Sequence, residues 1–177
     1  MMTPAPGAGG NPAAALQFPC DAVLLLPQRP PMQLIDTALS ADDSAAESRT
    51  VIRADNLLLN ENGRFPALGL IEVMAQTVGI FAGRMRILAG DKPREGLLLG
   101  TRRMLLNAPS FPVGSRLHCR VEKTFESDDG LWQFDCRVTL ERDEGSEPAG
   151  SAMLTVFNPP PGYFDEDEPN AAAKIIR

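Results

Sequence analysis

Residues 65–83, FPALGLIEVMAQTVGIFAG, contain one charged side chain, Glu72. Pro66 suits a first helical turn and Gly90 is a candidate stop, so the pattern predicts a helix over residues 68–88, roughly 30 Å long. Apolar side chains lie all round this helix, which leaves no face suited to water. Its length would suit a membrane span, but a carboxylate near the middle costs about 2.5–3.5 kcal/mol on insertion scales. We therefore expect a core helix that other structure covers, and no membrane span.

The rest of the chain has the period-two alternation of β-strands. Residues 116–122 and 132–141 alternate apolar and polar side chains on either side of a polar turn at 126–130, which predicts an antiparallel hairpin with one apolar face. Further strand patterns cover residues 32–39, 45–53, 96–106 and 152–157, the last after a turn at 143–150. A sheet of about six strands curled around the helix buries the apolar face of each, so the predicted class is α+β.

Composition sets the number of domains. The chain has 177 residues, of which 44% are hydrophobic, enough for one core and too few for two full domains. Residues 1–17 carry no charge and are rich in Ala, Gly and Pro, while residues 159–177 open with prolines and continue with an acidic run. We expect a single domain over residues 18–158 between a disordered tail and an acidic mobile tail.

Charge and scarce residues exclude several classes of function. A net charge of −6 argues against a partner that is nucleic acid, since a binder would carry a basic field. Three cysteines without CxxC spacing and a single histidine provide neither a disulfide framework nor a zinc site, so we expect no metal and no cofactor. The first 28 residues contain no Lys or Arg, which a secretory signal would require, and we expect a cytoplasmic protein.

Five stretches resemble the hotdog-fold 3-hydroxyacyl-[acyl-carrier-protein] dehydratases. They are LPQRPPMQLID (26–36), FPALGLIEVMAQTVG (65–79), GLLLGTRRM (96–104), FPVGSRL (111–117) and GLWQFDCRVTL (130–140). The most specific has a proline that opens the helix and Glu-x-Met-Ala-Gln six residues later. The spacing is most similar to a divergent bacterial branch, the predicted dehydratases of aryl polyene type clusters. The resemblance implies a hotdog fold, a long central helix wrapped by an antiparallel sheet.

The resemblance also implies site residues. Glu72 would be the helix carboxylate that acts on the β-hydroxyl, and Gln76, one turn later on the same face, would orient it. The backbone N–H of Ala67 would polarise the thioester carbonyl, a task that a helix N-terminus suits. Independently of the resemblance, a carboxylate among apolar side chains is hard to ionise and therefore suits proton transfer near neutrality. The competing interpretations are a Glu72 that only complements the helix dipole and a Gln76 that only satisfies backbone groups.

The chain departs from the family at the catalytic base. Where these dehydratases have Gly-His-Phe-Pro, this chain has Arg64 in the histidine's place, and where Leu-Pro-His is common it has Gln28. The one histidine, His118, falls on the polar face of its strand, which predicts a surface residue. Arginine stays protonated and cannot act as the base. Either Glu72 performs both proton transfers, or a histidine-bearing hotdog partner completes a hybrid site.

Candidate substrate contacts and partners follow from the same resemblance. Arg64 and Pro66 lie where the helix starts, and Arg102 and Arg103 are cations that could meet an acyl carrier protein or the phosphate of its pantetheine arm. Adjacent strand residues point to opposite faces, so Arg102 and Arg103 are not expected to form one clamp. The partners would be an acyl carrier protein with a phosphopantetheine thioester and a second hotdog chain, in a homodimer or a heterodimer.

Three functions remain open. The first is dehydration of a 3-hydroxyacyl thioester to the 2-enoyl thioester, by this chain alone or in a heterodimer. The second is an acyl thioesterase in which Glu72 activates water, which requires no histidine. The third is a non-catalytic subunit that binds the acyl carrier.

Overall fold

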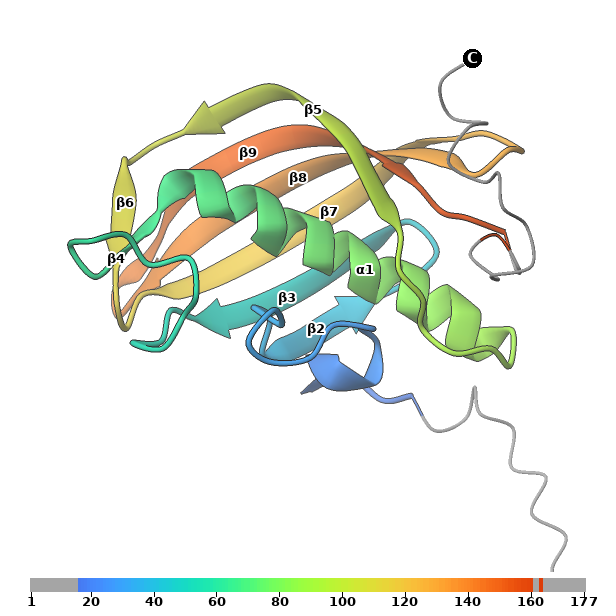
Figure 1. Cartoon of the computed structure of the whole chain (residues 1–177), viewed down its shortest axis with the longest axis horizontal. Coiled ribbons are helices and arrows are strands. Elements are labelled where there is room, and N and C mark those ends of the chain that lie inside the picture. Colours follow the sequence, from blue (N-terminus) through green and yellow to red (C-terminus); the bar gives the residue numbers. More distant parts are fainter. Residues whose placement is uncertain (1–15, 161–162, 164–177) are drawn as a thin grey trace, which may run out of the picture.

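The computed structural model describes residues 16–160 and Tyr163 (Figure 1). Its elements in chain order are β1 (Cys20–Asp21), the 3-10 helix η2 (Ala22–Leu24), β2 (Thr37–Ala41), β3 (Ala45–Val51), β4 (Arg64–Pro66), the 3-10 helix η3 (Ala67–Gly69), α1 (Leu70–Leu88), β5 (Leu97–Leu106), β6 (Ser110–Pro112), β7 (Arg116–Glu126), β8 (Leu131–Arg142) and β9 (Gly145–Phe157).

One large sheet wraps one long helix. The sheet has seven strands in the order β1-β2-β3-β7-β8-β9-β5, all paired antiparallel, and β4 and β6 form a separate two-stranded sheet. Figure 1 shows α1 lying along the inner face of the curved sheet. The predicted α+β architecture is therefore confirmed, with a sheet of seven strands rather than about six.

The hairpin of β7 and β8 supplies much of the core. Its inward side chains are buried as the alternation predicts: Leu117, Cys119, Val121, Trp132, Phe134, Cys136, Val138 and Leu140. Phe81 of α1 contacts the rings of Trp132 and Phe134 edge-on, with centroid distances of 5.7 and 5.2 Å. Such edge contacts are a favourable geometry for aromatic pairs, so this cluster fixes α1 against the sheet.

Two glycines bring the N-terminal loop onto α1. A Cβ at Gly83 would lie 2.0 Å from the Leu25 carbonyl oxygen, and a Cβ at Gly79 would lie 2.9 Å from Leu26 Cδ2. Leu25 and Leu26 are both fully buried. The loop that follows η2 therefore packs against α1 at a distance that a larger residue at position 83 would prevent.

Some predicted boundaries were wrong. The strand expected over residues 32–39 begins only at Thr37, because Met32 and Gln33 form a turn on the Arg29 carbonyl and the N–H of Leu34 donates to Gln76 instead of to a strand. The turn expected over residues 143–150 is shorter, since β9 already begins at Gly145. The pairing of β4 with β6 was not predicted, because three-residue strands leave no periodicity to detect.

The predicted tails lie mostly outside the described residues. Of the tail residues that are described, Leu16 packs against the core and Pro159 is buried. The extent of the domain, residues 18–158, stays a prediction.

The helical segment Ala67–Leu88 is long and apolar enough to cross a membrane by length and composition. Half of its most apolar window is buried within the fold, where the aromatic cluster and the sheet cover it. This burial fits the core helix that the sequence predicts.

Candidate active site

The start of α1 places Glu72 in the first helical turn. Pro66 is extended and precedes η3, and the N–H of Leu70 then donates to the carbonyls of Ala67 and Leu68 as the chain turns into α1. A Cβ at Gly69 would lie 2.6 Å from the Phe65 ring, so this turn packs directly on a buried aromatic side chain. The turn is therefore fixed by local packing, and with it the position of Glu72 on the helix.

Gln76 holds the Glu72 carboxylate. Its Nε2 donates to Glu72 Oε1 at 2.8 Å and to the Met32 carbonyl at 2.7 Å, while its Oε1 accepts from the N–H of Leu34 at 2.8 Å and from that of Ile35 at 3.4 Å. Gln76 is 2% exposed, and its four hydrogen-bonding positions are all used. It therefore both satisfies backbone groups and orients Glu72, so its two competing interpretations are compatible.

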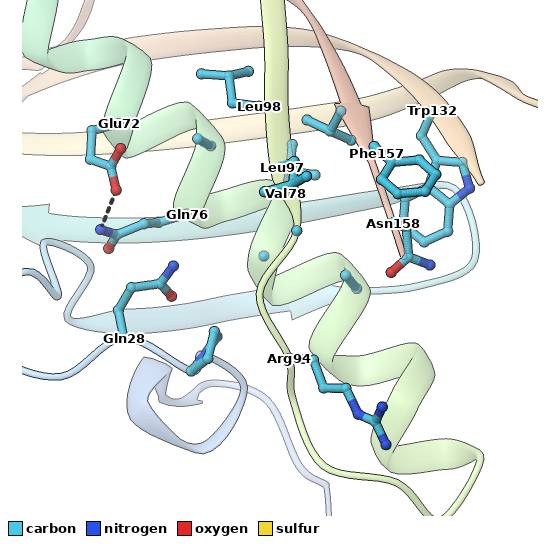
Figure 2. A pocket seen from close by; sticks show the side chains of 16 residues that line it. Gln28, Glu72, Gln76, Val78, Arg94, Leu97, Leu98, Trp132, Phe157 and Asn158 are labelled. Atoms are coloured by element: carbon cyan, nitrogen blue, oxygen red, sulfur yellow. Dashed lines mark hydrogen bonds between the residues drawn. The ribbon is translucent and has the colours of Figure 1, made fainter. Parts of the chain in front are cut away.

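Glu72 borders a pocket between α1, β5 and the N-terminal loop. The cavity measures about 140 Å³, and apolar side chains such as Val78, Leu97 and Leu98 line its middle. Figure 2 shows Glu72, Gln76 and Gln28 at one end, and Trp132, Phe157 and Asn158 at the other. Glu72 itself is half-buried. A carboxylate at one end of a pocket with apolar side chains in its wall suits acid–base chemistry on a substrate whose chain is apolar.

Gln28 is a pocket residue to which the sequence assigned no role. Its Oε1 is buried and has no hydrogen-bond partner among the described residues. The sequence signal was present, because Gln28 stands where Leu-Pro-His is common in the family, but position in a motif does not reveal whether a side chain faces a pocket.

The Ala67 N–H has a partner within the chain. It donates to the Pro109 carbonyl at 3.0 Å, and the residue is buried. This contact ties the start of η3 to the segment before β6. The N–H is therefore not free to polarise a thioester carbonyl in this structure.

The four predicted substrate contacts do not line the pocket. Arg64 donates from Nε to Ser110 Oγ at 2.8 Å, and Pro66 pairs with Ser110 across β4 and β6. Arg102 and Arg103 are exposed on β5. A register shift between Arg102 and Leu105, with a φ of 53° at Arg103, breaks the strict alternation on which their predicted opposite orientation rested.

His118 lies on the outer face of the sheet, away from α1. Its Nε2 is 2.9 Å from Glu47 Oε2, and Arg120 pairs with the same carboxylate. The His118 side chain is 27% exposed, as expected for a residue on the polar face of its strand. The fold therefore brings no histidine of this chain to Glu72.

Two of the three cysteines are core residues. Cys119 and Cys136 are buried in the core, and burial raises the pKa of the Cys119 thiol to about 12, which makes it a poor nucleophile and ligand. Within residues 16–160, no group of three or more His, Cys, Asp or Glu side chains could hold a metal ion.

Comparisons with known proteins identify the family. The model of the ApeP-like family, described as ApeP dehydratase, matches residues 20–168. The dehydratase heterocomplex ApeI:P from Xenorhabdus doucetiae is similar in structure, with a TM-score of 0.73 at 21% identity over 92% of this chain and 99% of that chain.

Two more distant structures share the fold. One is smu.793 from Streptococcus mutans bound to acetyl CoA, with a TM-score of 0.54 at 14% identity over 74% of this chain and 92% of that one. The other is a hypothetical thioesterase with coenzyme A from Streptococcus pneumoniae, with a TM-score of 0.50 at 18% identity over 68% and 82%. The chain has a hotdog-type fold and belongs to the ApeP-like dehydratase family.

Proposed function

We propose that this chain is a dehydratase subunit that removes water from a 3-hydroxyacyl thioester carried by an acyl carrier protein, with Glu72 as the acid. The observation that carries the proposal is the Glu72 carboxylate, held by Gln76 at one end of a pocket with apolar side chains in its wall. The product would be the 2-enoyl thioester. The family match supports dehydration as the reaction.

The geometry of Glu72 suits proton donation. Because Gln76 Nε2 occupies Oε1, the proton of a neutral Glu72 would be on Oε2, which accepts no hydrogen bond from the described residues. In the elimination, the C3–O bond breaks and the departing oxygen takes this proton, so that water leaves. The pair from the Cα–H bond forms the double bond, and the α-proton goes to a base.

A histidine from a second hotdog chain would be that base. His118 is on the outer face of the sheet, and Arg64, in the place of the family histidine, is bonded to Ser110. The similar structure from Xenorhabdus doucetiae is a dehydratase heterocomplex, which supports a pairing of unlike chains.

Strand β5 is the surface that best fits such a partner. It is an edge strand, bonded to β9 alone among the described strands, and it exposes leucines on both halves: Leu98, Leu99, Leu105 and Leu106. An exposed apolar edge strand is a template for pairing with another chain. Since Leu97 and Leu98 also line the pocket, a chain on this edge would lie next to the site.

Contacts with the carrier protein would come from arginines. Arg94 borders the pocket, and Arg102 and Arg103 are exposed on β5, so these cations could meet the acidic carrier or the phosphate of its pantetheine arm. The free thiols of Cys20, Cys119 and Cys136 suit a reducing compartment, and we place the reaction in the cytoplasm.

The decisive experiment is a mass measurement on the carrier. The purified chain, with and without candidate histidine-bearing hotdog partners, is incubated with a 3-hydroxyacyl carrier protein. Loss of one water from the carrier is expected in at least one pairing. Release of the free carrier thiol would instead establish the thioesterase alternative, in which Glu72 activates water without a histidine. An unchanged carrier in every pairing would favour the non-catalytic subunit.

Glu72→Gln tests the assigned acid. The amide keeps the size of the side chain and cannot donate a proton as an acid, so we expect turnover to fall about 10²- to 10⁴-fold. Glu61→Gln, the same change at an exposed loop residue, is the matched control and should leave turnover unchanged. Full activity in Glu72→Gln would refute the assignment.

A further inference from the structure

We propose that Gln28 binds the 3-hydroxyl group of the substrate, with its side-chain oxygen accepting a hydrogen bond from that hydroxyl. The inference rests on the proposed function and adds a residue that confers preference for a hydroxylated acyl chain. It starts from a contrast between the two glutamines that line the Glu72 pocket.

The contrast lies in how many hydrogen bonds each carboxamide makes. Gln76 uses all its donors and acceptors within the chain, so it has none left for a ligand. Gln28 makes no side-chain hydrogen bond with the described residues, and its Oε1 is buried. Buried polar oxygens are almost always satisfied in folded proteins, so an unsatisfied one in a pocket wall points to a partner that the chain itself does not contain.

The backbone around Gln28 is held in place. The Arg29 guanidinium donates from one nitrogen to three successive carbonyls, those of Leu26, Pro27 and Gln28, at 2.8, 3.3 and 2.7 Å. The same loop is packed against α1 through the close approach of Leu25 to Gly83. The loop therefore fixes where the side chain starts, while its terminal torsion, which no hydrogen bond restrains, can turn the oxygen toward a ligand.

The chemistry of the substrate selects the group that binds. The acyl part of a 3-hydroxyacyl thioester contains a single hydrogen-bond donor, the 3-hydroxyl. Figure 2 shows Gln28 at the same end of the pocket as Glu72 and Gln76, which is where the reacting carbons would lie. The hydroxyl hydrogen would point to Gln28 Oε1 and leave the oxygen lone pairs for the proton from Glu72. Gln28 exchanges no proton, and the products remain the 2-enoyl thioester and water.

A binding measurement tests this without requiring turnover. The probes are two pantetheine conjugates in which an amide replaces the thioester, 3-hydroxyhexanoyl pantetheine amide and hexanoyl pantetheine amide, titrated calorimetrically into the full-length chain. The wild type should bind the hydroxylated probe about fivefold more tightly, the factor that one neutral hydrogen bond provides. Gln28→Leu should lose this preference and keep its affinity for hexanoyl pantetheine amide. Gln28→His, whose ring nitrogen can accept, should retain the preference.

Stability separates ligand binding from a structural role. Gln28→Leu should melt at or above the wild-type temperature, because it removes a buried oxygen without a partner. Gln133→Leu, the same change on the outer face of β8, is the control and should keep the probe preference. A Gln28→Leu variant that keeps the preference, or that melts well below Gln133→Leu, would overturn the inference, as would a wild type that binds the two probes equally.

The outcomes distinguish this inference from the proposed reaction. If the wild type prefers the hydroxylated probe through Gln28 but no pairing removes water from the carrier, the dehydratase proposal fails and the assignment of Gln28 stands. If water is removed and Gln28→Leu keeps both turnover and preference, the dehydratase proposal stands and the assignment of Gln28 fails.

Discussion

Among single residues, Gln76 joins helix α1 to the loop before β2. One carboxamide connects α1 to Met32, Leu34 and Ile35 and holds Glu72. Gln76→Leu would remove the acceptor of two buried backbone N–H groups, those of Leu34 and Ile35, and the donor to the Met32 carbonyl, so we expect the free energy of unfolding to fall by about 3 kcal/mol. Urea denaturation measures this, with Gln133→Leu as control. A loss no greater than in the control would mean that these groups find other partners.

At the same scale, Glu47 predicts a pH effect. Burial alone would raise its pKa, but hydrogen bonds from His118 and Arg120 hold it below the ordinary value of 4.5. A carboxyl with a lowered folded-state pKa adds stability that is present above the unfolded-state pKa and lost as pH falls through the folded value. Glu47→Gln should therefore cost more stability at pH 7 than at pH 3. If urea denaturation shows that Glu47→Gln loses the same free energy of unfolding at both pH values, the lowered pKa is contradicted.

At the scale of elements, the contact between α1 and the N-terminal loop depends on Gly83. A methyl group there would meet the Leu25 backbone oxygen at 2.0 Å, whereas at Gly79 it would meet only the tip of the Leu26 side chain. We expect Gly83→Ala to lose about 1–3 kcal/mol by overpacking. Gly79→Ala should be nearly neutral, because the gain of about 1 kcal/mol in helix propensity offsets the contact. Thermal denaturation compares the two variants, and equal melting temperatures would contradict this account.

The elements also show what the sequence could predict. Alternation identified β7 and β8 within a few residues, because each strand packs one face on the core and leaves the other to water. It failed at residues 32–36, where the Leu34 N–H donates to a side chain 42 positions away, and at Arg103, where a bulge interrupts the strand. Contacts so distant in sequence, or confined to one residue, leave no local periodicity.

In the candidate site, too, local contacts could be predicted from the sequence and contacts between distant segments could not. Helical spacing placed Glu72 and Gln76 on one face, and the structure joins them at 2.8 Å. The hydrogen bond of the Ala67 N–H could not be predicted, because its acceptor, the Pro109 carbonyl, lies in a segment that the sequence does not place beside the helix. Gln28 was missed as a pocket residue for a similar reason, since its loop reaches α1 only through tertiary packing.

At the scale of the whole molecule, the exposed edge β5 predicts assembly. Leu99 and Leu105 are 48% and 66% exposed. Leu99→Lys with Leu105→Lys should prevent pairing with a second hotdog chain, because charged side chains disfavour edge-to-edge association. Light scattering coupled to size exclusion measures the assembly state. Phe125→Lys, a charge placed at an exposed aromatic outside β5, is the control, and an intact complex in the double variant would exclude this edge as the interface.

The order of elements along the chain has a consequence for synthesis. Helix α1 leaves the ribosome before β7, β8 and β9, the strands at the middle of the sheet that covers it. Strand β3 likewise cannot pair with β7 until β7 has been synthesised. The first residue of β7 follows the last residue of β3 by 65 positions (116 − 51). The nascent chain therefore exposes its most apolar segment until the last third has been translated. Any hotdog partner or chaperone that shields this helix acts during that interval, before the sheet closes.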